Sequence, residues 1–340
     1  MRYTLLGNSG LRVSEVALGT MTFGDDWGWG ASQSESAKQF ELFADAGGTL
    51  IDTANNYTNG TAESILGELL AADRDHFVLG TKYSLNVRDG DLNAGGNHRK
   101  NLVQSLEASL RRLRTDHLDL LWLHAWDYLT PPEEVMRALD DQVRLGKVLY
   151  PGVSDTPAWV IAQMQTLAAA RGWSPFIGLQ IEYSLIQREV ERELVPMARG
   201  LGLGVLAWGP LGAGILSGKY ASPAASGDAR RLTDVAPAQL AIAKTVADIA
   251  AELGHTPAQV ALAWIRAQQT IPILGARTAS QLADNLTCVE IDLPTDTLER
   301  LAQASYVPRG FPHDFLASAD YTLGGMATQL HLPPGRSRHG

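Results

Sequence analysis

The chain has 340 residues, 45% of them hydrophobic and 19% charged, which supplies apolar sequence for a large core and excludes disordered, collagenous and membrane-type compositions. Its formal net charge of −9 makes nucleic acid and anionic membranes unfavourable partners, so any anion that it binds requires a local basic pocket. The single cysteine, Cys288, excludes an internal disulfide framework and multi-cysteine metal sites, and because the N-terminus has no apolar leader, the expected location is cytoplasmic.

Short apolar β-prone runs alternate with helical segments along the whole chain, a pattern typical of repeated βα units. The pattern opens with a lead-in hairpin at 1–14, expected to plug the bottom of the fold. The strands are then expected at 15–20, 49–53, 77–82, 118–124, 148–154, 176–182, 203–208 and 271–276. The helices are expected near 34–46, 61–71, 98–114, 131–145, 156–171, 188–200, 237–267 (two pieces divided at Pro257) and 278–287.

The regular spacing of these units predicts the α/β class and a closed (β/α)8 TIM barrel, in preference to an open doubly wound sheet. Because no composition shift divides the chain, we expect a single domain over residues 1–340, with the barrel at 15–305 and a C-terminal tail at 306–340. The long loops after the first, third and seventh strands, together with the tail, would lie over the barrel mouth. Active sites of such barrels form at that end.

Ionisable residues close three consecutive strands. Asp52 ends the second strand, Lys82 the third and His124 the fourth, and Tyr57 lies in the loop after Asp52. Each alone has an ordinary explanation: a turn acid, a surface lysine, a core histidine or a rim aromatic. Together they would ring one mouth, where Lys82 is expected to lower the pKa of the Tyr57 phenol, Asp52 to hold Lys82, and His124 to orient a carbonyl oxygen. This set predicts carbonyl reduction.

Six segments, in order, resemble motifs of the aldo-keto reductase family, up to about residue 305: "IDTANNY", "GTKY", "LLWLH", "GVSD", "WGPLGAGILSGKY" and "ILGARTASQLADNL". The resemblance places the family's catalytic tetrad on Asp52, Tyr57, Lys82 and His124. It also implies an extended NADP(H) cofactor and direct hydride transfer without a metal.

The resemblance assigns residues along the cofactor as well. Ser154, Asp155 and Gln180 would surround the nicotinamide carboxamide, with Asp155 standing where many close relatives have Asn, and Trp208 would stack on the ring. The remaining expected contacts are Thr20, Met21, Asp52, the glycine loop with Gly209, Pro210, Leu211, Gly212, Ala213 and Lys219, and an adenosine cradle of Gly275, Arg277, Gln281, Asp284 and Asn285. Arg277 would face the 2′-phosphate. Arg230 or Arg231 would close over the pyrophosphate, or else belong to a solvated basic loop.

Aromatic residues of three loops form the expected substrate pocket: Trp27, Trp29, Trp126, Tyr128, Phe311 and Phe315. Such a wall suits an apolar or planar aldehyde or ketone, or the apolar face of a sugar. A small-molecule carbonyl is the expected partner, and the sequence leaves the oligomeric state open.

Other functions have less support in the sequence. No G-x-G-x-x-G opens a helix after the first strand, and the histidines lack metal-ligand spacing, so no metal is expected. The glycine loop also resembles the redox-sensing β-subunits of potassium channels, although the chain lacks their inactivation-type extension. A cofactor-free barrel isomerase, using Lys82 or Asp52, is a further alternative.

Overall fold

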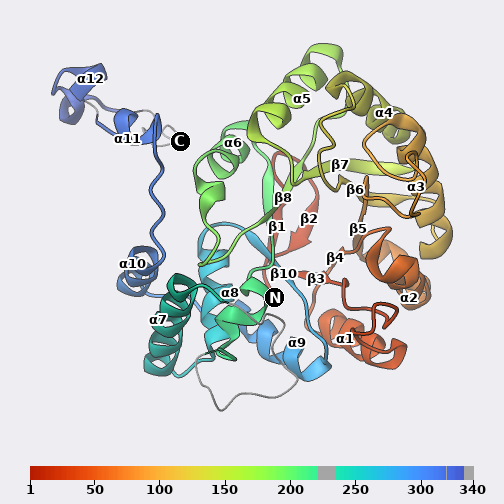
Figure 1. Ribbon diagram of the computed structural model, residues 1–340, viewed down its shortest axis with the longest axis horizontal. Coiled ribbons are helices and arrows are strands. Elements are labelled where there is room, and N and C mark those ends of the chain that lie inside the picture. Colours follow the sequence, from red (N-terminus) through yellow and green to blue (C-terminus); the bar gives the residue numbers. More distant parts are fainter. Residues whose placement is uncertain (221–234, 319, 333–340) are drawn as a thin grey trace.

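The computed structural model describes residues 1–220, 235–318 and 320–332, and its centre is a closed ring of parallel strands (Figure 1). Around the ring the strand order is β10-β3-β4-β5-β6-β7-β8-β9, so these eight strands leave no open edge. The predicted (β/α)8 TIM barrel is confirmed. The strands are β3 (Ala17–Gly19), β4 (Leu50–Asp52), β5 (Val78–Tyr83), β6 (Leu118–Leu123), β7 (Val148–Ser154), β8 (Gly178–Glu182), β9 (Gly204–Trp208) and β10 (Ile271–Leu274).

Helices pack around the outside of this ring (Figure 1). They are α1 (Gln33–Asp45), α2 (Thr61–Leu69), α3 (Arg99–Leu113), α4 (Pro132–Arg144), α5 (Ala158–Arg171), α6 (Leu194–Leu201), α7 (Pro237–Leu253), α8 (Pro257–Ala267), α9 (Ala279–Leu286) and α10 (Thr295–Ala304). The 3₁₀ turns are η1 (Tyr57–Gly60), η2 (Leu70–Ala72), η3 (Arg74–His76), η4 (Glu189–Glu191), η5 (Gly212–Ser217), η6 (Thr287–Glu290) and η7 (Ala327–Gln329). The predicted break at Pro257 is confirmed, because a capping box of Thr256 and Gln259 starts α8 there.

One large side chain, Trp122 of β6, fills the interior of the barrel. It is almost fully buried, and the neighbouring strands supply glycines where they face it. A Cβ atom at Gly152 would lie 2.3 Å from the Trp122 ring, and one at Gly178 or Gly80 within 2.9 Å of it. The glycines therefore make room for an indole that closes the barrel beneath its mouth.

The N-terminal hairpin, β1 (Tyr3–Leu5) and β2 (Arg12–Ser14), covers the opposite end of the barrel. Leu6 and Val13 are fully buried and belong to the same apolar cluster as Trp122. The turn lies against the barrel, since the Asn8 N–H donates to the Gly202 carbonyl at 2.8 Å. A Cβ at Gly7, where φ is +57°, would stand 2.4 Å from the Ile177 carbonyl oxygen. The expected plug is confirmed.

The tail after α10 leaves the barrel. Figure 1 shows α11 (His313–Leu316) and α12 (Asp320–Leu323) standing off to one side of the ring of helices. Hydrogen bonds from Arg188 to Ser305 and from Arg192 to the Pro308 carbonyl attach the base of the tail to the barrel. Among the helices described, none combines the length and apolar character that a membrane crossing requires.

Candidate active site

A cavity of about 980 Å³ opens at the carboxyl ends of the strands, where the predicted catalytic residues lie. Asp52, Tyr57 and His124 line it, and Lys82 lies buried directly behind them. The walls come from the carboxyl ends of the barrel strands and from the loops that follow them, so residues far apart in sequence converge on one space. A cavity of this size is in the range of small-molecule and cofactor sites.

Lys82 is the centre of the polar group at the base of this cavity. Its Nζ donates to Asp52 Oδ2 at 2.6 Å, to the Thr53 carbonyl at 2.8 Å and to the Tyr57 hydroxyl at 3.0 Å. The second carboxylate oxygen of Asp52 accepts from Gln180 Nε2 at 2.7 Å. All three N–H donors of Lys82 are therefore used, and one of them places the ammonium charge next to the phenol oxygen.

The charge states of the group follow from burial and from these contacts. Burial by itself lowers the pKa of Lys82, but the Asp52 carboxylate and the Tyr57 hydroxyl outweigh it, so the pKa is raised and the ammonium is retained. For Tyr57, burial raises the pKa above its usual 10 even though Lys82 acts in the opposite direction. The expected lowering by Lys82 is present, but desolvation outweighs it. Tyr57 remains a protonated phenol.

His124 lies edge-on to Tyr57, with the ring centroids 6.1 Å apart. Burial, together with the nearby Lys82 charge, lowers its pKa to about 3, so the imidazole is neutral near pH 7. Its Nδ1 atom is buried and has no partner among the described residues. A neutral ring with one nitrogen enclosed can present the other as a hydrogen-bond donor.

An unusual turn holds Tyr57 in place. The next three residues, Thr58, Asn59 and Gly60, all have left-handed backbone conformations, with φ of 45°, 56° and 96°. Thr58 stabilises the turn twice, because its hydroxyl donates to the Phe23 carbonyl at 2.7 Å and accepts from the Ala62 N–H at 3.0 Å. Two such non-glycine residues in succession carry backbone strain, which the surrounding contacts must offset.

The loop that supplies Trp27 and Trp29 is closed at its base by hydrogen bonds. Gly24 N–H donates to the Ala31 carbonyl at 2.9 Å, and Ala31 N–H donates to the Thr22 carbonyl at 2.7 Å. Both tryptophans line the cavity, with ring centroids 5.6 Å apart. They form the aromatic wall beside Tyr57, where the sequence predicts substrate contacts.

The other expected substrate residues lie elsewhere. Trp126 packs against the barrel core and does not line the cavity. Tyr128, Phe311 and Phe315 are 71%, 87% and 50% exposed and are also absent from the cavity wall. The two phenylalanines follow the tail away from the barrel, and Phe315 stacks on Tyr321 with the centroids 4.6 Å apart. The structure therefore does not bring these four residues to the site.

Four residues gather at the end of the cavity expected to hold nicotinamide: Ser154, Asp155, Gln180 and Trp208. The Ser154 hydroxyl is buried and makes no well-directed hydrogen bond within the described part of the chain. Asp155, with φ of 37°, accepts a hydrogen bond from Trp208 Nε1 at 3.1 Å. Gln180 donates one amide N–H to Asp52, which leaves its second N–H and its amide oxygen for further hydrogen bonds.

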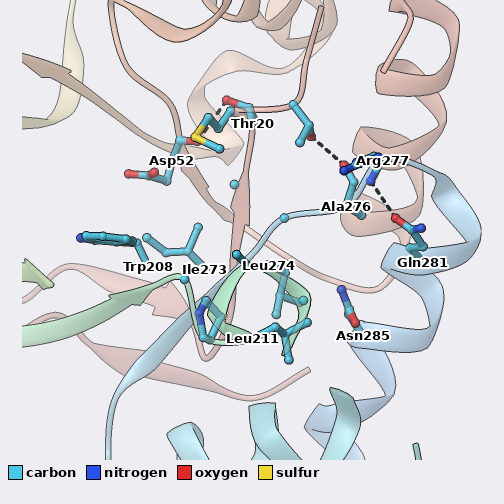
Figure 2. A pocket seen from close by; sticks show the side chains of 18 of the residues that line it. Thr20, Asp52, Trp208, Leu211, Ile273, Leu274, Ala276, Arg277, Gln281 and Asn285 are labelled. Carbon is cyan, nitrogen blue, oxygen red and sulfur yellow. Dashed lines mark hydrogen bonds between the residues drawn. The ribbon is translucent and has the colours of Figure 1, made fainter. Parts of the chain in front are cut away.

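The expected adenosine cradle lies at the other end of the cavity. Figure 2 shows Asp52 and Trp208 on one side and Arg277, Gln281 and Asn285 on the other, with β10 residues between them. The Arg277 N–H donates to Gln281 Oε1 at 2.9 Å. The structure also places at the cavity wall the expected residues Thr20, Met21, Gly209, Pro210, Leu211, Ala213, Lys219, Gly275 and Asp284, but not Gly212. Arg230 and Arg231 lie outside the described residues.

Asp284 lines the cavity as expected and also has a structural role. Its two carboxylate oxygens already accept hydrogen bonds, one from Gln259 Nε2 at 2.8 Å and one from Thr256 Oγ1 at 3.2 Å. These bonds join α9 to the start of α8, so Asp284 stabilises the cradle as well as lining it.

The sequence reasoning missed several lining residues, among them Asn56 and Glu182. Glu182 could have been found, because side chains two apart on a strand share a face and Gln180 was already assigned to the cavity. Asn56 belongs to the polar loop before Tyr57, and its Oδ1 atom is buried without a partner among the described residues.

The residues present fit an extended dinucleotide. A long cavity combines unpartnered buried polar atoms at one end with a lysine, an arginine and glycine-rich backbone at the other. Such a donor set suits an amide-bearing ring at the first end and phosphates at the second.

Comparison with known proteins agrees with the fold. The sequence profile described as "Aldo/keto reductase family" matches residues 15–305. The chain belongs to the aldo/keto reductase family and is an oxidoreductase.

Three relatives illustrate the similarity. The chain is 34% identical to norsolorinic acid reductase of Aspergillus flavus, an alignment that covers 92% of this chain and 83% of the relative. It is 34% identical to a putative aryl-alcohol dehydrogenase, AAD14, of Saccharomyces cerevisiae, over 91% of this chain and 87% of the relative. With the uncharacterized oxidoreductase YrpG of Bacillus subtilis it shares 39% identity, over 88% of this chain and 95% of the relative.

Proposed function

We propose that the protein reduces an aldehyde or ketone to the alcohol with NADPH, and that Tyr57 is the proton donor. The observation that carries this proposal is the hydrogen-bonded series Gln180, Asp52, Lys82 and Tyr57, which ends with a protonated phenol at the cavity surface. When bound, the reduced cofactor supplies the hydride to the carbonyl carbon.

Each residue has a separate task in this mechanism. As negative charge develops on the carbonyl oxygen, the Tyr57 hydroxyl donates its proton there. The resulting phenolate would be stabilised by Lys82, whose ammonium lies 3.0 Å from it and is held by Asp52. Neutral His124 donates a hydrogen bond to the same oxygen and orients the substrate.

The aromatic wall favours a planar substrate. Trp27 and Trp29 offer indole surface beside the polar group, which suits an aromatic aldehyde or ketone. The name of the yeast relative, a putative aryl-alcohol dehydrogenase, supports the same substrate class.

A substrate panel tests the proposal. The purified protein is mixed with NADPH and with aromatic aldehydes, aliphatic aldehydes and sugars, and loss of the reduced-nicotinamide absorbance is followed. We expect turnover, with the highest kcat/KM for aromatic aldehydes. Cofactor binding without turnover of any carbonyl would support a regulatory role instead, and absence of both binding and turnover would overturn the proposal altogether.

A further inference from the structure

Asp155 is a carboxylate at the end of the cavity that is proposed to receive the nicotinamide. It lines the cavity and accepts the indole hydrogen bond of Trp208 at 3.1 Å. No salt bridge is formed by Asp155 within residues 1–220, 235–318 and 320–332. Asp155 has a left-handed backbone conformation, with φ of 37°, and the preceding Ser154 is fully buried.

A second carboxylate, Glu182, lies at the same end. It is the last residue of β8, it lines the cavity, and its Cγ lies 3.8 Å from where a Cβ of Gly209 would stand. The described residues give it no salt-bridge partner either. The pKa of the Glu182 carboxyl is raised, mainly by burial and next by the negative charge of Asp155.

The charges at this end of the cavity do not balance. Asp52 and Lys82 neutralise one another at 2.6 Å, and His124 is neutral. Asp155 and Glu182 therefore leave an excess of negative charge in a partly enclosed space. The only cation that acts noticeably on Asp155 among the described groups is Lys82, which is already paired. At the opposite end, Lys219 and Arg277 supply positive charge.

This asymmetry distinguishes the two redox states of a nicotinamide cofactor. The oxidised ring carries a positive charge and the reduced ring is neutral, whereas the phosphates and the adenosine are the same in both. A negative potential around the ring therefore stabilises the oxidised form selectively, and contacts along the rest of the cofactor cancel in the ratio of the two affinities.

We propose that Asp155, assisted by Glu182, biases the cavity toward the oxidised cofactor. The inference rests on the proposed function, because it requires a nicotinamide ring at this end. A tenfold preference produced by this charge corresponds to about 1.4 kcal/mol, and it lowers the two-electron reduction potential of the bound cofactor by about 30 mV.

The test compares the dissociation constants of NADP+ and NADPH in wild-type protein and in Asp155→Asn. The asparagine has nearly the same shape and keeps an oxygen that can accept the Trp208 hydrogen bond, so the main change is the lost charge. Titration calorimetry is the suitable measurement, because it does not depend on Trp208 fluorescence. Burial raises the pKa of both the Asp155 and the Glu182 carboxyl, so the titrations are done at about pH 8, well above the usual carboxylate range, where both are expected to be ionised.

In Asp155→Asn we expect the ratio of Kd for NADP+ to Kd for NADPH to rise by about tenfold. Glu182→Gln should change the ratio in the same direction by about threefold, since Asp155 adjoins Trp208, the residue expected to stack on the ring, and Glu182 only adds to its charge. Glu299→Gln removes the same charge from the exposed face of α10 and should leave the ratio unchanged.

Two failures can be told apart. If wild-type protein binds neither cofactor, the proposed function fails and this inference falls with it. If both cofactors bind and the ratio stays within about twofold of wild type in Asp155→Asn and Glu182→Gln, the inference alone is overturned. A fall in the ratio in either variant would also overturn it.

Discussion

Replacing Tyr57 with phenylalanine removes one atom from the proposed site and leaves its surroundings nearly intact. The aromatic ring remains beside His124, and Lys82 keeps two of its three acceptors, Asp52 and the Thr53 carbonyl. Loss of one hydrogen bond of this kind costs about 1 kcal/mol of folding stability. We therefore expect Tyr57→Phe to fold, and to bind NADPH with a Kd within about twofold of wild type.

The effect on catalysis should be much larger. A positioned proton donor contributes roughly 10²- to 10⁴-fold, which corresponds to about 3–5 kcal/mol of transition-state stabilisation. The expected result is a fall of that size in kcat for an aromatic aldehyde, measured as the initial loss of reduced-nicotinamide absorbance. Titration calorimetry with NADPH and urea denaturation provide the two accompanying measurements.

Lys82→Met is the informative comparison. It leaves the Asp52 carboxylate buried with Gln180 as its remaining side-chain partner, and removing one member of a buried ion pair typically costs about 3–5 kcal/mol of stability. Lys82→Met should therefore lose stability and activity together, whereas Tyr57→Phe should lose activity alone. Near wild-type turnover in Tyr57→Phe would refute the assignment of the proton donor.

Three other expectations concern the cofactor, the substrate and pH. Arg277→Ala should weaken NADPH binding much more than NADH binding, because a guanidinium can hold the 2′-phosphate with paired hydrogen bonds; equal losses in titrations of both cofactors would contradict this role. Trp29→Ala should raise KM for bulky aromatic aldehydes by about tenfold and leave small aldehydes nearly unaffected, whereas Trp126→Ala, which changes core packing, should show no such dependence on size. His124 has a pKa lowered from 6.5 to about 3, so between these values the unfolded chain binds a proton that the folded chain does not, and stability should fall as pH is lowered through this range. Urea denaturation across this range should show a weaker fall in His124→Gln, and identical profiles would exclude the effect.

The sequence predicts the barrel well because its strands are buried on both faces and read as short apolar runs. Seven of the expected strands overlap the observed ones with end differences of at most two residues, and the strand expected at 148–154 coincides with β7. The first helix residue of α8 is also predicted, since Pro257 favours a helix start. The helix α10 was not predicted, although it begins directly after Pro294 and buries Leu301.

The positions of single side chains were harder to predict. Asp52, Lys82 and His124 lie within one residue of the ends of neighbouring parallel strands, so the strand order alone brings them together. Phe311 and Phe315 follow the last barrel helix, and nothing in their local pattern specifies that the tail leaves the mouth. The raised pKa of Tyr57 depends on burial, which a sequence does not report.

The closed base of the tryptophan loop has a consequence for engineering and for divergence within the family. The hydrogen bonds between Gly24 and Ala31, and between Ala31 and Thr22, join the two ends of the loop, while the Phe23 carbonyl at its base accepts the Thr58 hydroxyl. Residues 25–30 can therefore be exchanged as a cassette that keeps Asp26 and Gly30. The Thr61 hydroxyl donates to Asp26 Oδ1 at 3.1 Å beside the Tyr57 turn, and a Cβ at Gly30 would lie 1.9 Å from the Gly24 carbonyl oxygen. Substrate range and chemical competence would then vary independently, and grafting this hexapeptide from another reductase should transfer selectivity while the recipient's proton donor stays in place.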